Sequence, residues 1–247
     1  TLIAFKKSHA PIKKFDQVRS DFVANASHEL KTPVAGIRLL SEAIRDAAEI
    51  EDKKSLNLFI DRLDNEAERL QRLVIYLLVL SRLEETPDPD RCPRTDLHSA
   101  IVTSFMAHKG EAEDKHLDLV LDDRSVTGDD CYADMEPSDA SLVFDNLIEN
   151  AIMYTDEGSI LVTFEPRGHE IAVIVQDTGI GIPQTDQSRI FERFYRVDKA
   201  RSREVGGTGL GLSLVRHAVE RSKGRVSVKS NPGEGSQFTV VFPRAKR

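Results

Sequence analysis

Apolar residues recur every three or four positions through the N-terminal third of the chain. In residues 11–48 the apolar face contains Ile12, Phe15, Val18, Phe22, Ala26, Leu30, either Pro33 or Val34, Ile37 and Leu40. In residues 53–85 a heptad-like spacing places Leu56, Ile60, Leu63, Ala67, Leu70, Val74 and Leu77 on one seam. Such spacing is typical of amphipathic helices. The pattern therefore predicts two long helices joined by a short polar turn near residues 46–51.

A single hairpin of this kind leaves part of each apolar seam uncovered. Pairing two copies into a four-helix bundle would bury both seams, so we expect a homodimer. The alternative is a helical pair that packs inside a larger monomer.

The pattern changes after residues 86–93 (TPDPDRCP), where three prolines indicate a linker. Helical patterns follow at 96–113, 138–154 and 210–222. Strand patterns lie at 117–121, 131–135, 159–165, 170–176, 226–229 and 237–242, the third and fourth split by Pro166, Arg167 and Gly168. Helices interspersed with strands predict a two-layer α/β sandwich. The predicted fold class is α + α/β, with a leader at 1–11, a helical domain at 12–85, a linker at 86–94 and a second domain at 95–247.

Composition narrows the class of protein. The 247 residues are 40% hydrophobic and 30% charged, and the net charge of −7 gives no case for binding nucleic acid. The two cysteines, Cys92 and Cys131, lack metal-ligand spacing and fit a reduced, cytoplasmic setting. No apolar run is long enough to span a membrane, and no signal peptide is visible. Because the chain starts without methionine, we expect a fragment whose membrane attachment depends on segments outside this sequence.

His28 is the first candidate for chemistry. It lies about 200° around the predicted helix from Leu30, and therefore faces solvent. An imidazole is a good nucleophile toward phosphorus at neutral pH, and the adjacent Glu29 can orient it and accept its proton. Thr32 lies one turn later on the same face, where its hydroxyl can hold a water for hydrolysis of a phosphoryl group. Pro33 is expected to bend the helix just beyond. The alternative is a surface histidine without a role.

Two asparagines, Asn146 and Asn150, share one face of the predicted helix at 138–154. The apolar residues of that helix expected to face the sheet are Leu142, Val143, Leu147 and Ala151. Amide oxygens on one face can bind Mg²⁺, a cation that takes few protein ligands and keeps waters. The alternative is an ordinary polar helix face.

Asp177 directly follows a predicted strand, and a buried carboxylate there needs a hydrogen-bond donor. The exocyclic amine of adenine is such a donor. Gly179 and Gly181 let the backbone turn closely around a ligand. Residues 206–212 (GGTGLGL) open the predicted helix at 210–222, where free N–H groups and the helix dipole favour an anion. Neither stretch matches a P-loop or a complete dinucleotide-binding fingerprint.

Residues 184–205 are too long for an ordinary loop in a compact domain and predict either a lid over the site or a disordered segment. The segment is mainly polar and charged, with an apolar and aromatic group at Ile190, Phe191, Phe194 and Tyr195. Arg193 and Arg196 are candidates for contacting phosphate, with solvated surface charges as the alternative for each.

In order, these motifs resemble the boxes of sensor histidine kinases of two-component systems. The phosphoacceptor box is HELKTP (28–33), the asparagine box NLIENA (146–151), the first glycine box DTGIGIP (177–183), the F-box FERFYR (191–196) and the second glycine box GGTGLGL (206–212). By this resemblance residues 12–85 form a HisKA-type dimerisation and phosphotransfer domain, and 95–247 an ATP-binding domain of the Bergerat type. Residues 1–11 resemble the end of a PAS sensor domain, with a helical leader as the alternative.

The resemblance implies an enzyme that phosphorylates His28 from ATP and Mg²⁺ and passes the phosphoryl group to an aspartate of a response regulator. It also implies phosphatase activity through Thr32, and a cytoplasmic domain of a membrane-anchored sensor. Mg²⁺ would bind Asn150, with Asn146 as a second candidate. The implied ATP-binding residues are Asn146, Asn150, Tyr154, Asp177, Gly179, Gly181, Ile182, Tyr195, Arg196, Gly207, Thr208, Gly209, Leu210, Gly211 and Leu212. Met153 departs from the family, which often has Lys or Arg before the tyrosine.

Two rival functions remain at this stage. An ATPase of the same nucleotide-binding superfamily would hydrolyse ATP without a phosphohistidine, but it does not explain His28 and Glu29. A dimerisation module without activity is disfavoured by the intact motifs.

Overall fold

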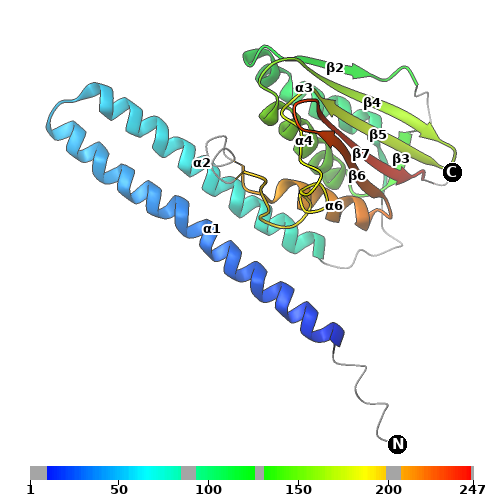
Figure 1. Ribbon diagram of the computed structural model, residues 1–247, viewed down its shortest axis with the longest axis horizontal. Helices are drawn as coiled ribbons and strands as arrows, with labels where there is room; N and C mark the ends of the chain where they lie inside the picture. Colours follow the sequence, from blue (N-terminus) through cyan, green and yellow to red (C-terminus); the bar gives the residue numbers. More distant parts are fainter. Residues whose placement is uncertain (1–9, 85–92, 126–130, 199–206, 246–247) are drawn as a thin grey trace, which may run out of the picture. The chain divides into compact units, whose positions relative to one another are not determined.

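The structure is a computed structural model that describes residues 10–84, 93–125, 131–198 and 207–245 (Figure 1). It forms two compact units that divide between Leu78 and Val79. Of the residues 1–11 that resemble the end of a PAS domain, 1–9 lie outside the described residues, and 10 and 11 belong to the first helix. None of the described helices is both long and apolar enough to cross a membrane.

The first unit is a hairpin of helix α1 (Ala10–Glu49) and helix α2 (Lys53–Glu84) up to Leu78, as the periodicity predicts, and the end of α2 belongs to the second unit. Figure 1 shows them running in opposite directions. The turn ends at Asp52, whose Oδ1 accepts hydrogen bonds from the backbone N–H groups of Lys54 and Ser55. A carboxylate in this position satisfies donors that the first turn of a helix leaves unpaired.

One face of each helix is buried in the hairpin. On α1 the buried residues include Ala26, Pro33 and Ala47, and on α2 they include Leu73. Pro33, rather than Val34, therefore lies on the packed side, because Val34 is 54% exposed. The helix continues through Pro33 without a break in its assignment, so the predicted bend there stays a prediction.

The hairpin also buries a charge. The side chain of Arg69 is 6% exposed, with Nη2 3.5 Å from Glu29 Oε2 and Nη1 3.7 Å from Glu66 Oε2. A buried guanidinium is costly unless carboxylates balance it. Glu29 therefore ties α1 to α2 through Arg69, and Glu66, one turn away on α2 itself, adds a second balancing carboxylate.

The second unit is built on a five-stranded sheet in the order β2 (Asp118–Asp122), β4 (Ser159–Arg167), β5 (Glu170–Asp177), β7 (Gly235–Pro243) and β6 (Arg225–Asn231). β2 and β4 are parallel and the other neighbours are antiparallel.

The expectation that Pro166 and Arg167 separate two strands is wrong, because both belong to β4. The pairing of β4 with β2 ends at Thr163. Beyond that point no described strand pairs with this edge of β4, so a proline there removes no ladder hydrogen bond among the described residues.

Helices α3 (Leu97–Asp114), α4 (Pro137–Tyr154) and α6 (Gly211–Arg221) cover one face of the sheet (Figure 1). The predicted two-layer arrangement is therefore confirmed. α4 buries Val143, Leu147 and Ala151 as expected, while Leu142 is only half-buried. Because α4 packs between α3 and α6, it also buries Phe144 and Ile148 on its flanks.

The first short strand of the second unit was not predicted. β1 (Arg94–Asp96) pairs with β3 (Tyr132–Asp134), so Arg94, which we assigned to the linker, belongs to a strand. Residues 85–92 of the predicted linker lie outside the described residues, and the domain boundary stays a prediction. Asp96 caps α3, because its side chain accepts hydrogen bonds from the N–H groups of His98 and Ser99.

His108 links α3 to α4 electrostatically. Its Nε2 lies 3.7 Å from Asp145 Oδ1 on α4, and its Nδ1 lies 3.5 Å from Glu111 Oε2. Asp145, more than Glu111, raises the pKa of His108 above its usual value, against the lowering effect of burial.

The raised pKa makes the stability of the second unit dependent on pH. Its contribution is fully present below the unfolded-state pKa of histidine and is lost as pH rises through the folded-state pKa. We expect His108→Gln to be about 0.5–1 kcal/mol less stable than the wild type below about pH 5.5. The gap should shrink as the pH is raised through neutrality. Urea unfolding at a series of pH values measures it, and a gap that does not change with pH would contradict the assignment.

Candidate functional site

Asp177 is the last residue of β5 and lies, as predicted, at the end of a strand. Its side chain is buried, and Oδ1 accepts hydrogen bonds from the N–H groups of Gly179 (2.9 Å) and Ser236 (3.1 Å). Burial raises the pKa of the Asp177 carboxyl, and these two hydrogen bonds offset part of that effect. Among the described residues nothing donates to Oδ2, which is left to accept from a ligand.

The glycines after Asp177 let three backbone segments meet. A Cβ on Gly179 would lie 2.2 Å from the carbonyl oxygen of Tyr154, at the end of α4. Gly181 has a φ of 69°, and a Cβ there would lie 2.0 Å from the carbonyl oxygen of Asn231. The loop therefore needs glycine because protein backbone packs against it, in addition to any approach of a ligand.

The two asparagines of α4 lie on one face, but their surroundings differ. Nδ2 of Asn146 donates to the Leu142 carbonyl (2.8 Å), and Nδ2 of Asn150 donates to the Asn146 carbonyl (2.7 Å). Asn146 is 4% exposed, and its Oδ1 would lie 2.4 Å from a Cβ on Gly211. Asn146 thus supports the start of α6, whereas the half-buried Asn150 is better placed for a metal ion.

The described residues contain no cluster of three or more His, Cys, Asp or Glu that could hold a metal ion. A cation at Asn150 would therefore complete its shell with water and ligand oxygens, which suits Mg²⁺.

The second glycine box leads into α6. Gly207, Thr208 and Gly209 precede the helix, Leu210 is its N-cap residue, and Gly211 and the half-buried Leu212 form its first turn. Gly206 lies outside the described residues. The carbonyl of Gly209 accepts a hydrogen bond from the N–H of Phe194 (2.7 Å), which joins the box to the lid. The backbone N–H groups and the positive dipole end at a helix start favour an anion.

The described part of the predicted lid, residues 184–198, is held by contacts with the sheet. The ring of Phe191 packs edge-on against Phe238 of β7, with the centroids 6.5 Å apart. Gln187 Nε2 donates to the carbonyls of Ile182 (3.0 Å) and Ser230 (2.7 Å). The prediction that aromatic residues anchor the lid is confirmed for Phe191.

Two other lid residues, Tyr195 and Arg193, make contacts with side chains of the lid and of α6. The Tyr195 hydroxyl donates to Asp186 Oδ1, and Arg189 lies 4.2 Å above the Tyr195 ring. Arg193 Nη2 lies 3.1 Å from His217 Nε2 on α6. The predicted contacts of Tyr195 and the half-buried Arg196 with ATP stay predictions.

His217 was not singled out by the sequence, because a lone histidine on a helix face gives no signal. Its Nδ1 lies 2.8 Å from the Ser213 carbonyl, so Nδ1 carries the hydrogen and Nε2 accepts from Arg193.

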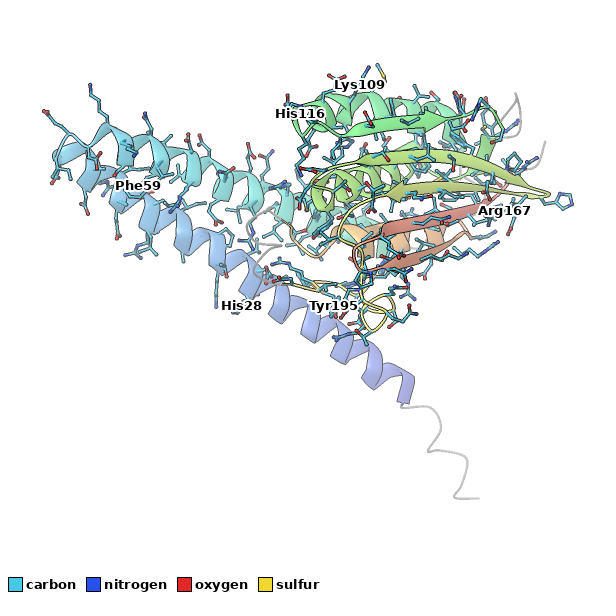
Figure 2. The ribbon with its side chains drawn as sticks, turned by 45° about the horizontal axis from the view of Figure 1, so that its top comes forward. His28, Phe59, Lys109, His116, Arg167 and Tyr195 are labelled. Carbon is cyan, nitrogen blue, oxygen red and sulfur yellow. The ribbon has the colours of Figure 1, made fainter. Side chains whose placement is uncertain are left out.

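The phosphoacceptor candidates lie on α1. His28 is exposed, as predicted (Figure 2). Thr32 Oγ1 donates to the carbonyl of His28 (3.3 Å), which places its hydroxyl one turn from the imidazole. Glu29 pairs with the buried Arg69, a partner that the sequence pattern did not reveal.

Two family models match the chain. Residues 18–86 match the His Kinase A (phospho-acceptor) domain. Residues 135–246 match the histidine kinase-, DNA gyrase B- and HSP90-like ATPase domain.

Full-length relatives extend well beyond this chain. The sensor-like histidine kinase SenX3 of Mycolicibacterium smegmatis is 38% identical over 234 residues, which cover 93% of this chain and 59% of SenX3. The sensor histidine kinase WalK of Bacillus subtilis is 36% identical over 238 residues, covering 94% of this chain and 38% of WalK.

Solved structures share the fold. The Acinetobacter baumannii histidine kinase AdeS has a TM-score of 0.69 at 23% identity, covering 89% of this chain and 98% of that chain. Histidine kinase ThkA in complex with the response regulator protein TrrA has a TM-score of 0.67 at 20% identity, covering 95% and 65%. Full-length ShkA in complex with AMPPNP has a TM-score of 0.66 at 23% identity, covering 92% and 46%.

The contact between Gly211 and Asn146 predicts the effect of a single methyl group. We expect Gly211→Ala to lower the free energy of unfolding by about 1–3 kcal/mol, because the methyl group would overlap the amide of Asn146. Gly110→Ala is the matched control, since Gly110 lies in α3 with nothing within 4 Å of an added Cβ. The Gly110→Ala variant should have a free energy of unfolding about 0.5–1 kcal/mol higher than the wild type. Urea unfolding compares the two, and equal stability of Gly211→Ala and the wild type would contradict the close contact.

Proposed function

Since the chain belongs to the sensor histidine kinases and carries both their phosphoacceptor and ATPase-type domains, we propose that it transfers the γ-phosphoryl group of ATP to His28. The observation that carries this proposal is the combination of two features. One is an exposed histidine followed directly by a carboxylate. The other is the buried Asp177, with Oδ2 available to a ligand, at a glycine-rich edge.

Nucleotide binding rests on the edge where β5 ends. Asp177 Oδ2 accepts a hydrogen bond from the exocyclic amine of adenine, and the N-terminus of α6 faces the phosphates. Asn150 supplies an amide oxygen to Mg²⁺, which neutralises phosphate charge. Catalysis then depends mainly on positioning and on charge stabilisation.

At His28 a ring nitrogen attacks the γ-phosphorus in line. A P–N bond forms, the bond to the bridging oxygen breaks, and ADP leaves. Glu29 orients the ring and accepts the proton of the other nitrogen. A carboxylate has about four acceptor positions, so its pairing with Arg69 leaves room for the imidazole N–H.

The phosphoryl group then passes to an aspartate of a response regulator. The fold shared with ThkA, whose structure includes a response regulator, supports this partner. Thr32 serves the reverse reaction by placing a water for hydrolysis of the regulator's phosphoryl group. Its hydroxyl can still accept from that water while it donates to the His28 carbonyl.

The helical unit is proposed to form a homodimer through a four-helix bundle. Large apolar side chains remain exposed on its two helices, and a second copy would cover them. They include Val34, Leu39, Leu58, Ile60, Val74, Ile75 and Leu78.

We further propose that the chain is the cytoplasmic part of a membrane-anchored sensor. Its coverage of 59% of SenX3 and 38% of WalK leaves room for other segments in such proteins.

Phosphorylation with γ-labelled ATP and Mg²⁺ tests the activity. We expect label that is lost in acid and kept in base, that is absent from His28→Ala, and that persists in His169→Ala. His169 is an exposed histidine on the β4–β5 turn and serves as the control. Label that survives in His28→Ala would overturn the assignment. ATP hydrolysis without a phosphoenzyme would favour the ATPase alternative.

The role of Thr32 can be separated from that of His28. Thr32→Ala should keep the phosphorylation of His28 and lose at least about tenfold in dephosphorylation of the regulator, because a positioned water contributes to hydrolysis. Thr32→Ser retains the hydroxyl and should restore the rate. The measurement follows loss of label from a receiver domain that the wild-type chain has phosphorylated. An unchanged rate in Thr32→Ala would show that this hydroxyl has no part in hydrolysis.

A further inference from the structure

Three polar side chains form a row across neighbouring strands at one end of the sheet. Ser230 of β6 is the register partner of Ser236 of β7, which is in turn the register partner of Asp177 of β5. Directly opposed residues on antiparallel strands share a face, with Cβ atoms about 5 Å apart. Two residues along their strands, the same face continues into the buried Val175 and Phe238. The row therefore lies on the helix-covered face of the sheet, at the end of the strands where the candidate site is.

The hydroxyl of Ser230 has every hydrogen-bonding position occupied. It accepts from the N–H of Ile182 (2.7 Å), donates to the carbonyl of Gly235 (2.7 Å) and lies 3.0 Å from the hydroxyl of Ser236. A hydroxyl has one hydrogen and two lone pairs. Because its hydrogen goes to Gly235, Ser230 must accept in the contact with Ser236.

This assignment fixes the polarity of Ser236. The Ser236 hydroxyl donates its hydrogen to Ser230. It can therefore act only as an acceptor toward the neighbouring Asp177 and toward any ligand. Oδ2 of Asp177 is likewise an acceptor. The row therefore presents two acceptors and no side-chain donor, which matches an exocyclic –NH₂ with its two hydrogens, either directly or through a water. A carbonyl oxygen at the same position would meet only other acceptors.

Ser230 also holds both segments that bind Asp177. The loop that it contacts through Ile182 carries the N–H of Gly179, and the turn that it contacts through Gly235 leads to the N–H of Ser236. Both N–H groups donate to Asp177 Oδ1. One side chain on β6 thus sets the position of the carboxylate without touching it.

We propose that Ser230 is a specificity-determining positioning residue, which makes this end of the site select a purine that bears an exocyclic amine over one that bears a carbonyl. The inference rests on the proposed binding of an adenine nucleotide. It assigns part of the selectivity for adenine to Ser230, a residue that does not contact the base.

Calorimetric titration of the full chain with three ligands tests the proposal. The ligands are ADP, the diphosphate of purine riboside, which lacks the amine, and GDP. Ser230→Ala should weaken the binding of ADP about tenfold, as expected when a hydrogen bond to a charged group is misplaced. The affinity for the purine riboside diphosphate should change by less than about twofold. The preference for ADP over GDP should narrow, because the freed Ser236 hydroxyl can then donate to a carbonyl.

Two variants on the same strand act as controls. Ser230→Thr keeps the hydroxyl and should restore most of the ADP affinity. Ser227→Ala removes an exposed hydroxyl on the other face of β6 and should change nothing. Equal losses for ADP and the purine riboside diphosphate in Ser230→Ala would indicate general damage and overturn the proposal, as would an unchanged affinity for ADP. A wild-type chain that binds none of the three ligands would instead refute the proposed function itself.

Discussion

The second unit depends on keeping one carboxylate charged in a buried position. Burial of an unpaired carboxylate costs several kcal/mol, and Asp177 offsets part of this cost by accepting hydrogen bonds from two backbone N–H groups. Those donors come from different segments, so both must approach the end of β5. Glycine is needed where they do, since a Cβ on Gly235 would lie 2.0 Å from the Asp177 carbonyl oxygen. The glycine-rich edge that suits a nucleotide thus also meets the needs of this side chain.

The two carboxylates for which we propose functional roles are stabilised in opposite ways. Glu29 is balanced by a guanidinium, whereas Asp177 is held by neutral N–H groups, which leave its full charge directed at a ligand. This difference suits the two roles. A group that orients an imidazole needs a fixed position, while a group that selects an amine needs an uncompensated acceptor.

Periodicity located the long helices and most strands, because each has one packed face that repeats in the sequence. It failed where structure depends on a distant partner. β1 has three residues, too few for a pattern, and exists through its pairing with β3. The pair of Arg193 and His217 joins a loop to a helix far along the chain. Asp177 was predictable because the end of a strand is a local signal, whereas the polarity that Ser230 imposes depends on register between strands.

The buried Arg69 has a mechanical consequence for the hairpin. Sliding α1 along α2 by one helical turn would carry Glu29 about 5.4 Å along the axis and remove it from the buried Arg69, which would keep Glu66 of its own helix beside it. The loss of a buried partner costs about 3–5 kcal/mol, more than thermal motion supplies. The pair of Glu29 and Arg69 therefore opposes sliding of the two helices past each other. A stimulus that travels along α1 can reach His28 as a tilt or a bend of the helix, but not as a one-turn slide.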